Sequence, residues 1–237
     1  MAALLTLSGV TKRFGGLVAN NDIAMEVDAG QIVGLIGPNG AGKTTLFNCI
    51  AGFYPPTSGS IVFRGENIVG LPPEVIAARG IARTFQIVRV FASLTVLENV
   101  MVGAMLHTKS VNAAAAKAHD VLRFVGLGAS ASRHASAVTV AEQKRLEVAR
   151  SLSLDPQLII LDEVMAGLNA VEVKAAVDLV LRIRDRGIAC LVVEHVMEGI
   201  MPIADRMIVL DYGKKIADGT PSEIASDPAV IAAYLGA

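Results

Sequence analysis

The amino-acid sequence predicts an α/β fold in which a mostly parallel sheet is interrupted by one helical segment. Apolar residues make up 53% of the 237 residues and charged residues only 18%, and the mean hydropathy is +0.54. This composition suits parallel strands that are buried on both faces. Short apolar runs alternate with helical patterns, as expected for parallel strands joined by helical crossovers. Residues 94–153 instead carry apolar positions at helical spacing with little strand signal.

The first third of the chain contains short apolar runs separated by turn residues. We expect strands at 4–7, 23–27, 31–36, 61–63 and 81–85, and helices at 43–51 and 72–79. The clearest turns are Asp28-Ala29-Gly30 and the proline, serine and glycine cluster at 55–59. A glycine-rich loop at 37–42 joins a strand to a helix.

The helical segment and the last third of the chain differ in pattern. Asn112 is the expected N-cap of an alanine-rich helix at 113–125. A helix at 140–153 is expected to end before Asp155-Pro156, because the residue before proline disfavours the helical conformation. Strands are expected again at 158–161, 188–193 and 207–210, with helices at 171–186 and 196–203. The helical segment is therefore predicted to be inserted into an α/β core.

Charge and composition exclude several classes of protein. The net charge is −1 and no basic tract stands out, so nucleic acid is not expected as a partner. The most apolar region, Ile188–Leu210, is broken by charged residues and a proline, whereas a spanning helix needs about 20 mostly apolar residues. Without a secretion signal at the N-terminus, we expect a cytoplasmic protein. An apolar surface reserved for a partner is a second use for the high apolar content.

The cysteines and histidines do not form a recognisable metal site. Cys49 and Cys190 lie far apart in the sequence and form no CxxC pair, so both are expected to be buried and reduced. Any metal is expected to be a hard cation held by oxygen and phosphate.

The glycine-rich loop carries the strongest functional signal. It fits G-x-x-x-x-G-K-[ST] and comprises Gly37, Pro38, Asn39, Gly40, Ala41, Gly42, Lys43, Thr44 and Thr45. Glycines let successive backbone N–H groups converge on phosphate oxygens, and the following helix adds its positive N-terminal end. Lys43 would supply a charge to the β- and γ-phosphates, and Thr44 a hydroxyl to Mg²⁺. The motif predicts binding of a nucleoside triphosphate.

Two carboxylates, Asp162 and Glu163, follow the apolar strand at 158–161. They are expected at the carboxyl edge of a parallel sheet, where α/β proteins bind ligands. Asp162 can hold Mg²⁺, usually through water, and Glu163 can polarise the attacking water as a general base. Neighbouring residues of a strand point to different sides, which suits two different roles.

The order and spacing of these motifs resemble those of ABC transporter ATPases over nearly the whole chain. The resemblance implies that ATP is bound with Mg²⁺ and that Phe14 stacks on adenine. It implies that Gln86 senses Mg²⁺ and the attacking water, and that His195 lies near the γ-phosphate. Residues 166–169 occupy the place of the loop that contacts a partner ATPase.

The same resemblance implies a domain organisation and partners. A core lobe at 1–86 and 156–237, with a mostly parallel sheet and an antiparallel β subdomain, would carry an inserted helical subdomain at 87–155. ATP would be sandwiched between this chain and a second ABC ATPase subunit, either an identical chain or a paralogue. Transmembrane permease subunits, and indirectly a solute-binding protein, would complete a transporter on the inner face of the cell membrane.

More narrowly, the chain is similar to the ATP-binding subunits of branched-chain amino acid importers. This similarity is carried by 12–16, 37–54, 83–86, 166–169 and the tail 233–236. Relatives that import urea or amides would look alike, so the solute stays open. A soluble ABC ATPase without a transport role is another alternative, although no coiled coil, second cassette or basic extension is visible. A GTPase fits less well because no N-K-x-D motif is present, and a P-loop kinase because it would give no reason for the helix at 143–150 or for His195.

The chain departs from the resemblance at the family's signature, L-S-G-G-Q. The matching stretch is Val138-Thr139-Val140-Ala141-Glu142. Thr139 keeps a hydroxyl for the phosphate, but Ala141 replaces a glycine that permits close approach of the backbone. Because the signature would complete the site of the opposite subunit, we expect that partner site to be slow. Val164 and Val196 are smaller departures, next to the expected base and histidine.

Overall fold

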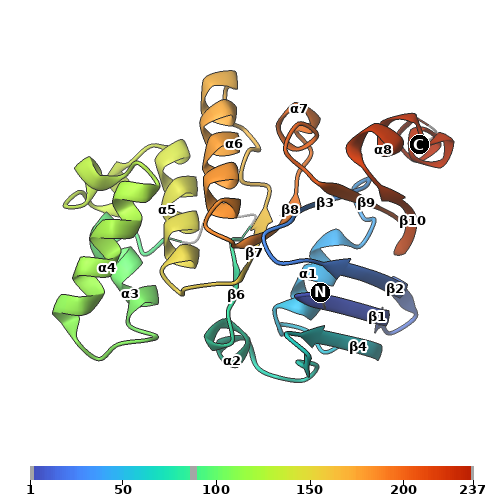
Figure 1. Ribbon diagram of the computed structural model, residues 1–237, viewed down its shortest axis with the longest axis horizontal. Helices are drawn as coiled ribbons and strands as arrows, with labels where there is room; N and C mark the ends of the chain where they lie inside the picture. The colour runs from blue at the N-terminus through green and yellow to red at the C-terminus, as the bar shows by residue number, and fades with distance from the viewer. Residues whose placement is uncertain (1–2, 86–89, 236–237) are drawn as a thin grey trace.

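The computed structural model describes residues 3–85 and 90–235 and confirms the predicted α/β fold. A four-stranded antiparallel sheet lies beside a larger sheet and shares a core with it (Figure 1). Its order is β2-β1-β4-β5, formed by β1 (Leu5–Phe14), β2 (Leu17–Val27), β4 (Ser58–Phe63) and β5 (Glu66–Asn67). Strands β1 and β2 are longer than the sequence predicted, because they pair across a tight turn up to Phe14 and Leu17.

The larger sheet has six strands in the order β10-β9-β3-β8-β7-β6. They are β3 (Ile32–Ile36), β6 (Ile81–Arg83), β7 (Leu158–Asp162), β8 (Ala189–Val193), β9 (Arg206–Asp211) and β10 (Lys214–Gly219). All neighbours pair in parallel except β10, which runs antiparallel to β9. Strands β3, β7 and β8 are buried along their whole length, as expected for central parallel strands. Their carboxyl ends therefore meet at one edge of the sheet.

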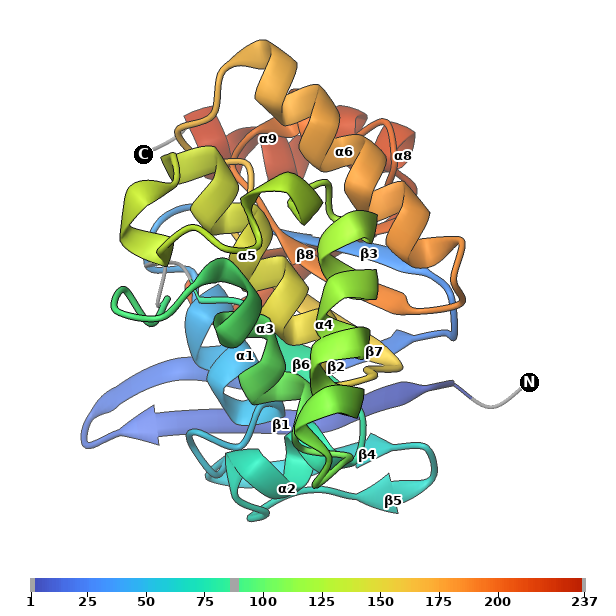
Figure 2. The same ribbon diagram turned by 90° about the vertical axis from the view of Figure 1, so that its left-hand side faces the viewer.

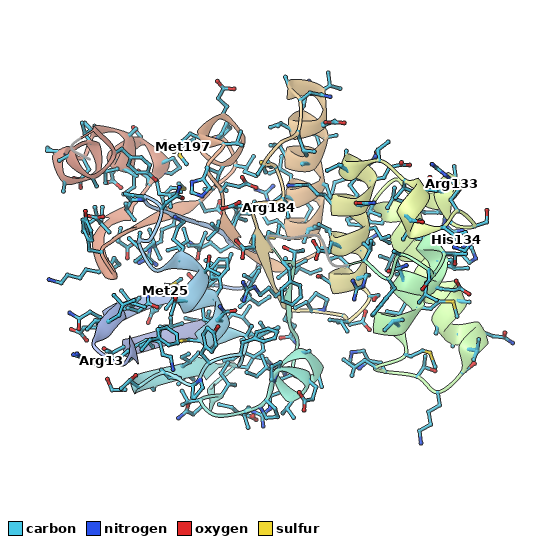
Figure 3. The ribbon with its side chains drawn as sticks, turned by 180° about the vertical axis from the view of Figure 1, so that it is seen from behind. Arg13, Met25, Arg133, His134, Arg184 and Met197 are labelled. Atoms are coloured by element: carbon cyan, nitrogen blue, oxygen red, sulfur yellow. The ribbon has the colours of Figure 1, made fainter. Side chains whose placement is uncertain are left out.

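Helices cover the larger sheet and form a separate group at one end of the molecule (Figures 1 and 2). The first six are α1 (Lys43–Ile50), α2 (Pro73–Ala78), α3 (Val96–Ala104), α4 (Val111–Phe124), α5 (Val140–Leu152) and α6 (Ala170–Arg184). The last three are α7 (Met197–Ile200), α8 (Pro221–Ser226) and α9 (Pro228–Leu235). Figure 3 places Arg13 and Met25 on the antiparallel sheet and Arg133 and His134 at the opposite, helical end.

Most differences from the predicted elements arise at their ends. The expected cap Asn112 is wrong: Ser110 caps α4 by accepting a hydrogen bond from the Ala113 N–H, so Asn112 lies in the first turn. Strand β6 ends at Arg83, and α7 is only four residues long. The helix α5 ends at Leu152, close to its predicted stop. The boundaries of the two proposed lobes stay a prediction.

Two further expectations concern single residues and membrane spans. Cys49 and Cys190 are free and buried, as predicted, and burial raises the pKa of the two thiols to about 11 and about 12. Within the described parts of the chain, no helix combines the length and the apolar character needed to cross a membrane.

Candidate functional site

The glycine-rich loop is folded into its shape by close backbone contacts. Gly37, Gly40 and Gly42 have φ angles of 148°, 82° and 100°, which side chains other than glycine rarely adopt. A Cβ atom on Gly42 would lie 2.3 Å from the Ala19 carbonyl oxygen, and one on Gly37 would lie 2.0 Å from the Leu210 carbonyl oxygen. Gly37 and Gly42 are therefore required by both conformation and space, whereas Gly40 is favoured by conformation alone. The loop rests against β2 and the end of β9.

The loop forms one wall of a pocket of about 440 Å³. The residues that line the pocket are Leu17, Val18, Ala19, Asn39, Gly40, Ala41, Gly42, Lys43, Thr44, Thr45, Glu163, His195 and Tyr212. The Lys43 ammonium donates to the carbonyls of Gly37 at 2.6 Å and Pro38 at 2.9 Å. Burial lowers the pKa of Lys43, while the charges of Glu163 and Asp162 oppose that shift. The sheet edge thus brings a partly desolvated cation close to two carboxylates.

Glu163 and His195 meet opposite the loop, although they are 32 residues apart in the sequence. The His195 Nε2 atom lies 2.9 Å from the Glu163 Oε1 atom. They come together because β7 and β8 pair in parallel register and end at the same edge. Glu163 has a φ angle of 52°, and its N–H donates to the Val193 carbonyl at 2.9 Å. Such a conformation is strained for a residue with a side chain and is typical of functional sites.

Asp162 is turned toward β6 instead of lining the pocket. Its Oδ2 atom lies 2.9 Å from the Arg83 guanidinium, and both side chains are buried. The Asp162 N–H donates to the Thr84 hydroxyl at 2.9 Å. Burial raises the pKa of Asp162, and Arg83 opposes this shift. The sequence did not predict the Arg83–Asp162 ion pair, because it depends on β6 and β7 being neighbours in the sheet. Gln86, the third predicted metal ligand, lies outside the described residues.

Comparisons with known proteins agree with this geometry. The family described as ABC transporter matches residues 20–166. The chain is 43% identical over 249 aligned residues to the high-affinity branched-chain amino acid transport ATP-binding protein LivG of Escherichia coli K12, which covers 98% of each protein. The chain belongs to the ABC transporter family. Members of this family bind and hydrolyse ATP, so the chain is an ABC ATPase.

Further relatives and a solved structure support the same conclusion. BraF of Pseudomonas aeruginosa, also named for high-affinity branched-chain amino acid transport, is 41% identical over 98% of each protein. Residues 214–237 match a family described as branched-chain amino acid ATP-binding cassette transporter. The ADP conformation of MJ1267, an ATP-binding cassette of an ABC transporter, superposes with a TM-score of 0.91 at 29% identity over 100% of both chains.

The ABC cassette places Phe14 at the end of β1, outside the residues that line the pocket. Its ring packs edge-to-face on Tyr54, with centroids 5.3 Å apart, and the Lys12 ammonium lies 4.9 Å from its centroid. The aromatic side chain that does line the pocket is Tyr212, which is 86% exposed. Tyr212 could not be predicted from the sequence, because a single tyrosine in a turn belongs to no recognised motif. The stacking of Phe14 on adenine stays a prediction.

The signature stretch lies apart from the loop pocket within this chain. Thr139 caps α5, where its hydroxyl accepts from the Glu142 N–H at 3.2 Å and its own N–H donates to Glu142 at 2.9 Å. The Ser130 hydroxyl adds a hydrogen bond of 2.9 Å to Glu142. Thr139, Ala141 and Glu142 line a second pocket of about 250 Å³ between α5 and α6. These residues therefore belong to a different surface from Lys43 and Glu163.

Proposed function

We propose that this ABC ATPase powers an importer for branched-chain amino acids or a related small polar solute. The observation that carries the proposal is that Glu163 and His195 pair on one side of a pocket and that the glycine-rich loop forms its opposite wall. The import of branched-chain amino acids is suggested by LivG and BraF, which are named for that transport, and by the matching C-terminal segment.

In this mechanism the loop binds the triphosphate and the acidic edge hydrolyses it. Backbone N–H groups of the loop, the Lys43 ammonium and the N-terminus of α1 would hold the phosphates of ATP. The chain's oxygen donors suit Mg²⁺, which prefers oxygen ligands: Thr44 offers a hydroxyl in the pocket, and Gln86 is a further proposed ligand. Asp162 would act through water, because its carboxylate is paired with Arg83 and does not line the pocket. When bound, Mg²⁺ would neutralise charge on the phosphates.

Glu163 is the proposed general base. Its carboxylate lines the pocket and would accept the proton of the attacking water. His195, held 2.9 Å from Glu163, would orient that carboxylate and contact the γ-phosphate. Glu163 directly follows β7 and His195 lies two residues past the end of β8, so the parallel pairing of these strands brings both groups to one edge of the sheet.

A second ABC ATPase subunit, identical or paralogous, would complete the site. The signature lies away from the loop pocket of its own chain, at Thr139, Ala141 and Glu142. This placement is what we expect if the signature completes the site of the opposite chain. The methyl group of Ala141 would keep the N-terminus of α5 further from the partner's phosphate than glycine would. We therefore propose that the site completed by this signature turns over slowly.

Transmembrane permease subunits would dock on the helical group. A groove of about 520 Å³ between this group and α2 is lined by exposed apolar side chains at the end of α3 and just after it, including Val102, Met105 and Leu106, and by Phe85. Exposed apolar patches of this kind mark contacts with other proteins. The chain would then lie peripherally on the inner face of the cell membrane, and a solute-binding protein would act through the permease.

Uptake measurements on the assembled transporter test the proposal. The chain would be expressed with its permease subunits and solute-binding protein in membrane vesicles loaded with Mg-ATP, and uptake of labelled leucine, urea and acetamide compared. We expect leucine uptake that Glu163→Gln abolishes while ATP binding is kept. Uptake of urea or acetamide without uptake of leucine would assign the importer to those solutes instead. Failure of the permease subunits to co-purify with the chain would favour a soluble ABC ATPase.

A further inference from the structure

A carboxylate without a place in the mechanism is buried beside His195. Glu194 directly follows the last residue of β8 and is 0% exposed. Its Oε1 atom accepts a hydrogen bond from the Met165 N–H at 2.6 Å, whereas its Oε2 atom has no hydrogen-bond partner within residues 3–85 and 90–235. Burial raises the pKa of Glu194 to about 7. A buried, partly unsatisfied carboxylate is costly to a fold, so a role for it is expected.

The cation whose charge acts on Glu194 comes from another motif. Lys144 lies in the first half of α5, five residues after the Thr139 cap, and is half-buried. Its ammonium donates to the backbone carbonyl of Glu163 at 2.8 Å. The charges of Glu194 and Glu163 both act on Lys144 and oppose the lowering of its pKa by burial. The signature helix is therefore tied to the residue that carries the proposed base.

These contacts hold both ends of one short turn. Lys144 binds the carbonyl of Glu163, and Glu194 binds the N–H of Met165, two residues further on. Glu163 itself has the strained φ angle of 52°, which persists only where the surroundings fix it. Figure 1 shows the helix α5 beside α6 and close to β7, and Glu194 directly follows β8, so the turn is held from the helical group and from the sheet.

We propose that Lys144 and Glu194 are positioning residues that hold the turn at 163–165 and thereby connect the signature helix to the base of the same chain. The inference rests on the proposed role of Glu163. A signature that engages nucleotide on the opposite subunit would move α5, and Lys144 would pass that movement to the Glu163 carboxylate. Hydrolysis in one site would then depend on what the signature of the same chain has bound.

Substitutions of Lys144 separate positioning from folding. Lys144→Met keeps the length of the side chain but removes the donor, and Lys144→Arg keeps a donor. We expect Lys144→Met to lower kcat for ATP by about tenfold, with KM changed by less than about twofold, and Lys144→Arg to restore most of kcat. The exposed Lys174→Met on α6 is the matched control and should leave kcat unchanged.

Substitutions of Glu194 test the other end of the turn. Glu194→Ala should lower kcat about as much as Lys144→Met. Glu194→Gln should keep most of kcat, because its amide oxygen still accepts the hydrogen bond from the Met165 N–H. The double variant Lys144→Met/Glu194→Ala should be no slower than either single variant. Wild-type kcat in Lys144→Met, additive losses in the double variant, or losses that the conservative variants do not restore would overturn the inference. The proposed role of Glu163 fails separately, if Glu163→Gln retains turnover.

Discussion

At the scale of single residues, Lys43 is a buried cation beside the loop pocket. The residue is 7% exposed, and its ammonium donates hydrogen bonds to two carbonyls of the loop. Burial lowers the pKa of this ammonium. Transfer of the ammonium from those carbonyls to phosphate oxygens would exchange neutral acceptors for charged ones, which make stronger hydrogen bonds. The free-energy cost of desolvating the Lys43 ammonium would therefore be offset by its contact with the phosphates of ATP.

Lys43→Ala is expected to weaken ATP binding by at least about tenfold, because the variant loses a charge-assisted hydrogen bond to the phosphates. Titration of the purified chain with a fluorescent ATP analogue measures the dissociation constant. Lys174→Met, which removes a charge on the exposed face of α6, is the control for net charge. Equal affinities of wild type and Lys43→Ala would contradict the proposed binding mode.

Glu194 predicts a pH-dependent stability. Its pKa is about 7 in the folded chain and 4.5 in the reference state, so the folded state binds this proton more tightly. Its contribution to stability is therefore fully present below pH 4.5 and is lost as the pH rises to about 7. Relative to Glu194→Gln, the wild type should lose on the order of 3 kcal/mol between pH 4.5 and 8. Urea unfolding of both proteins at several pH values measures this, and a difference independent of pH would contradict it.

At the scale of elements, the sequence predicted what depends on neighbouring residues. The strand β3, the glycine-rich loop and α1 follow one another along the chain, so their pattern sufficed to predict them. The start of α4 was missed because Ser110 and Asn112 are both good caps, and the geometry of the preceding turn decides between them. The contacts of Asp162 with Arg83 and of Glu194 with Met165 follow from the strand order β8-β7-β6, which no local pattern encodes.

The N-terminus of α5 is the element whose sequence departs most from the family resemblance. The capping box between Thr139 and Glu142 shows that the helix begins normally, so the departure concerns the approach to a partner and not the fold. Ala141→Gly should raise ATP turnover of the assembled transporter, at a cost of up to about 1 kcal/mol in stability. Steady-state hydrolysis and thermal unfolding check both effects, and unchanged turnover would count against a slow site.

At the scale of the whole molecule, the chain must transmit work from the sheet edge to another protein. The helical group carries an exposed apolar surface at the end of α3, where Val102 and the following Met105 are each 47% exposed. The same groove includes Arg83, which pairs with Asp162 at the carboxyl end of β7. A permease segment bound in the groove would therefore lie against Arg83, whose guanidinium is paired with the Asp162 carboxylate.

Met105→Glu tests whether the permease binds in this groove. A carboxylate in the apolar groove would remain desolvated in the complex, so the variant should lose co-purification with the permease subunits. Val111→Glu introduces the same charge at another exposed apolar position of the helical group, outside the groove, and should retain the permease. Thermal unfolding of both isolated variants separates lost docking from lost folding. Equal co-purification of the two folded variants would place the permease contact elsewhere on the chain.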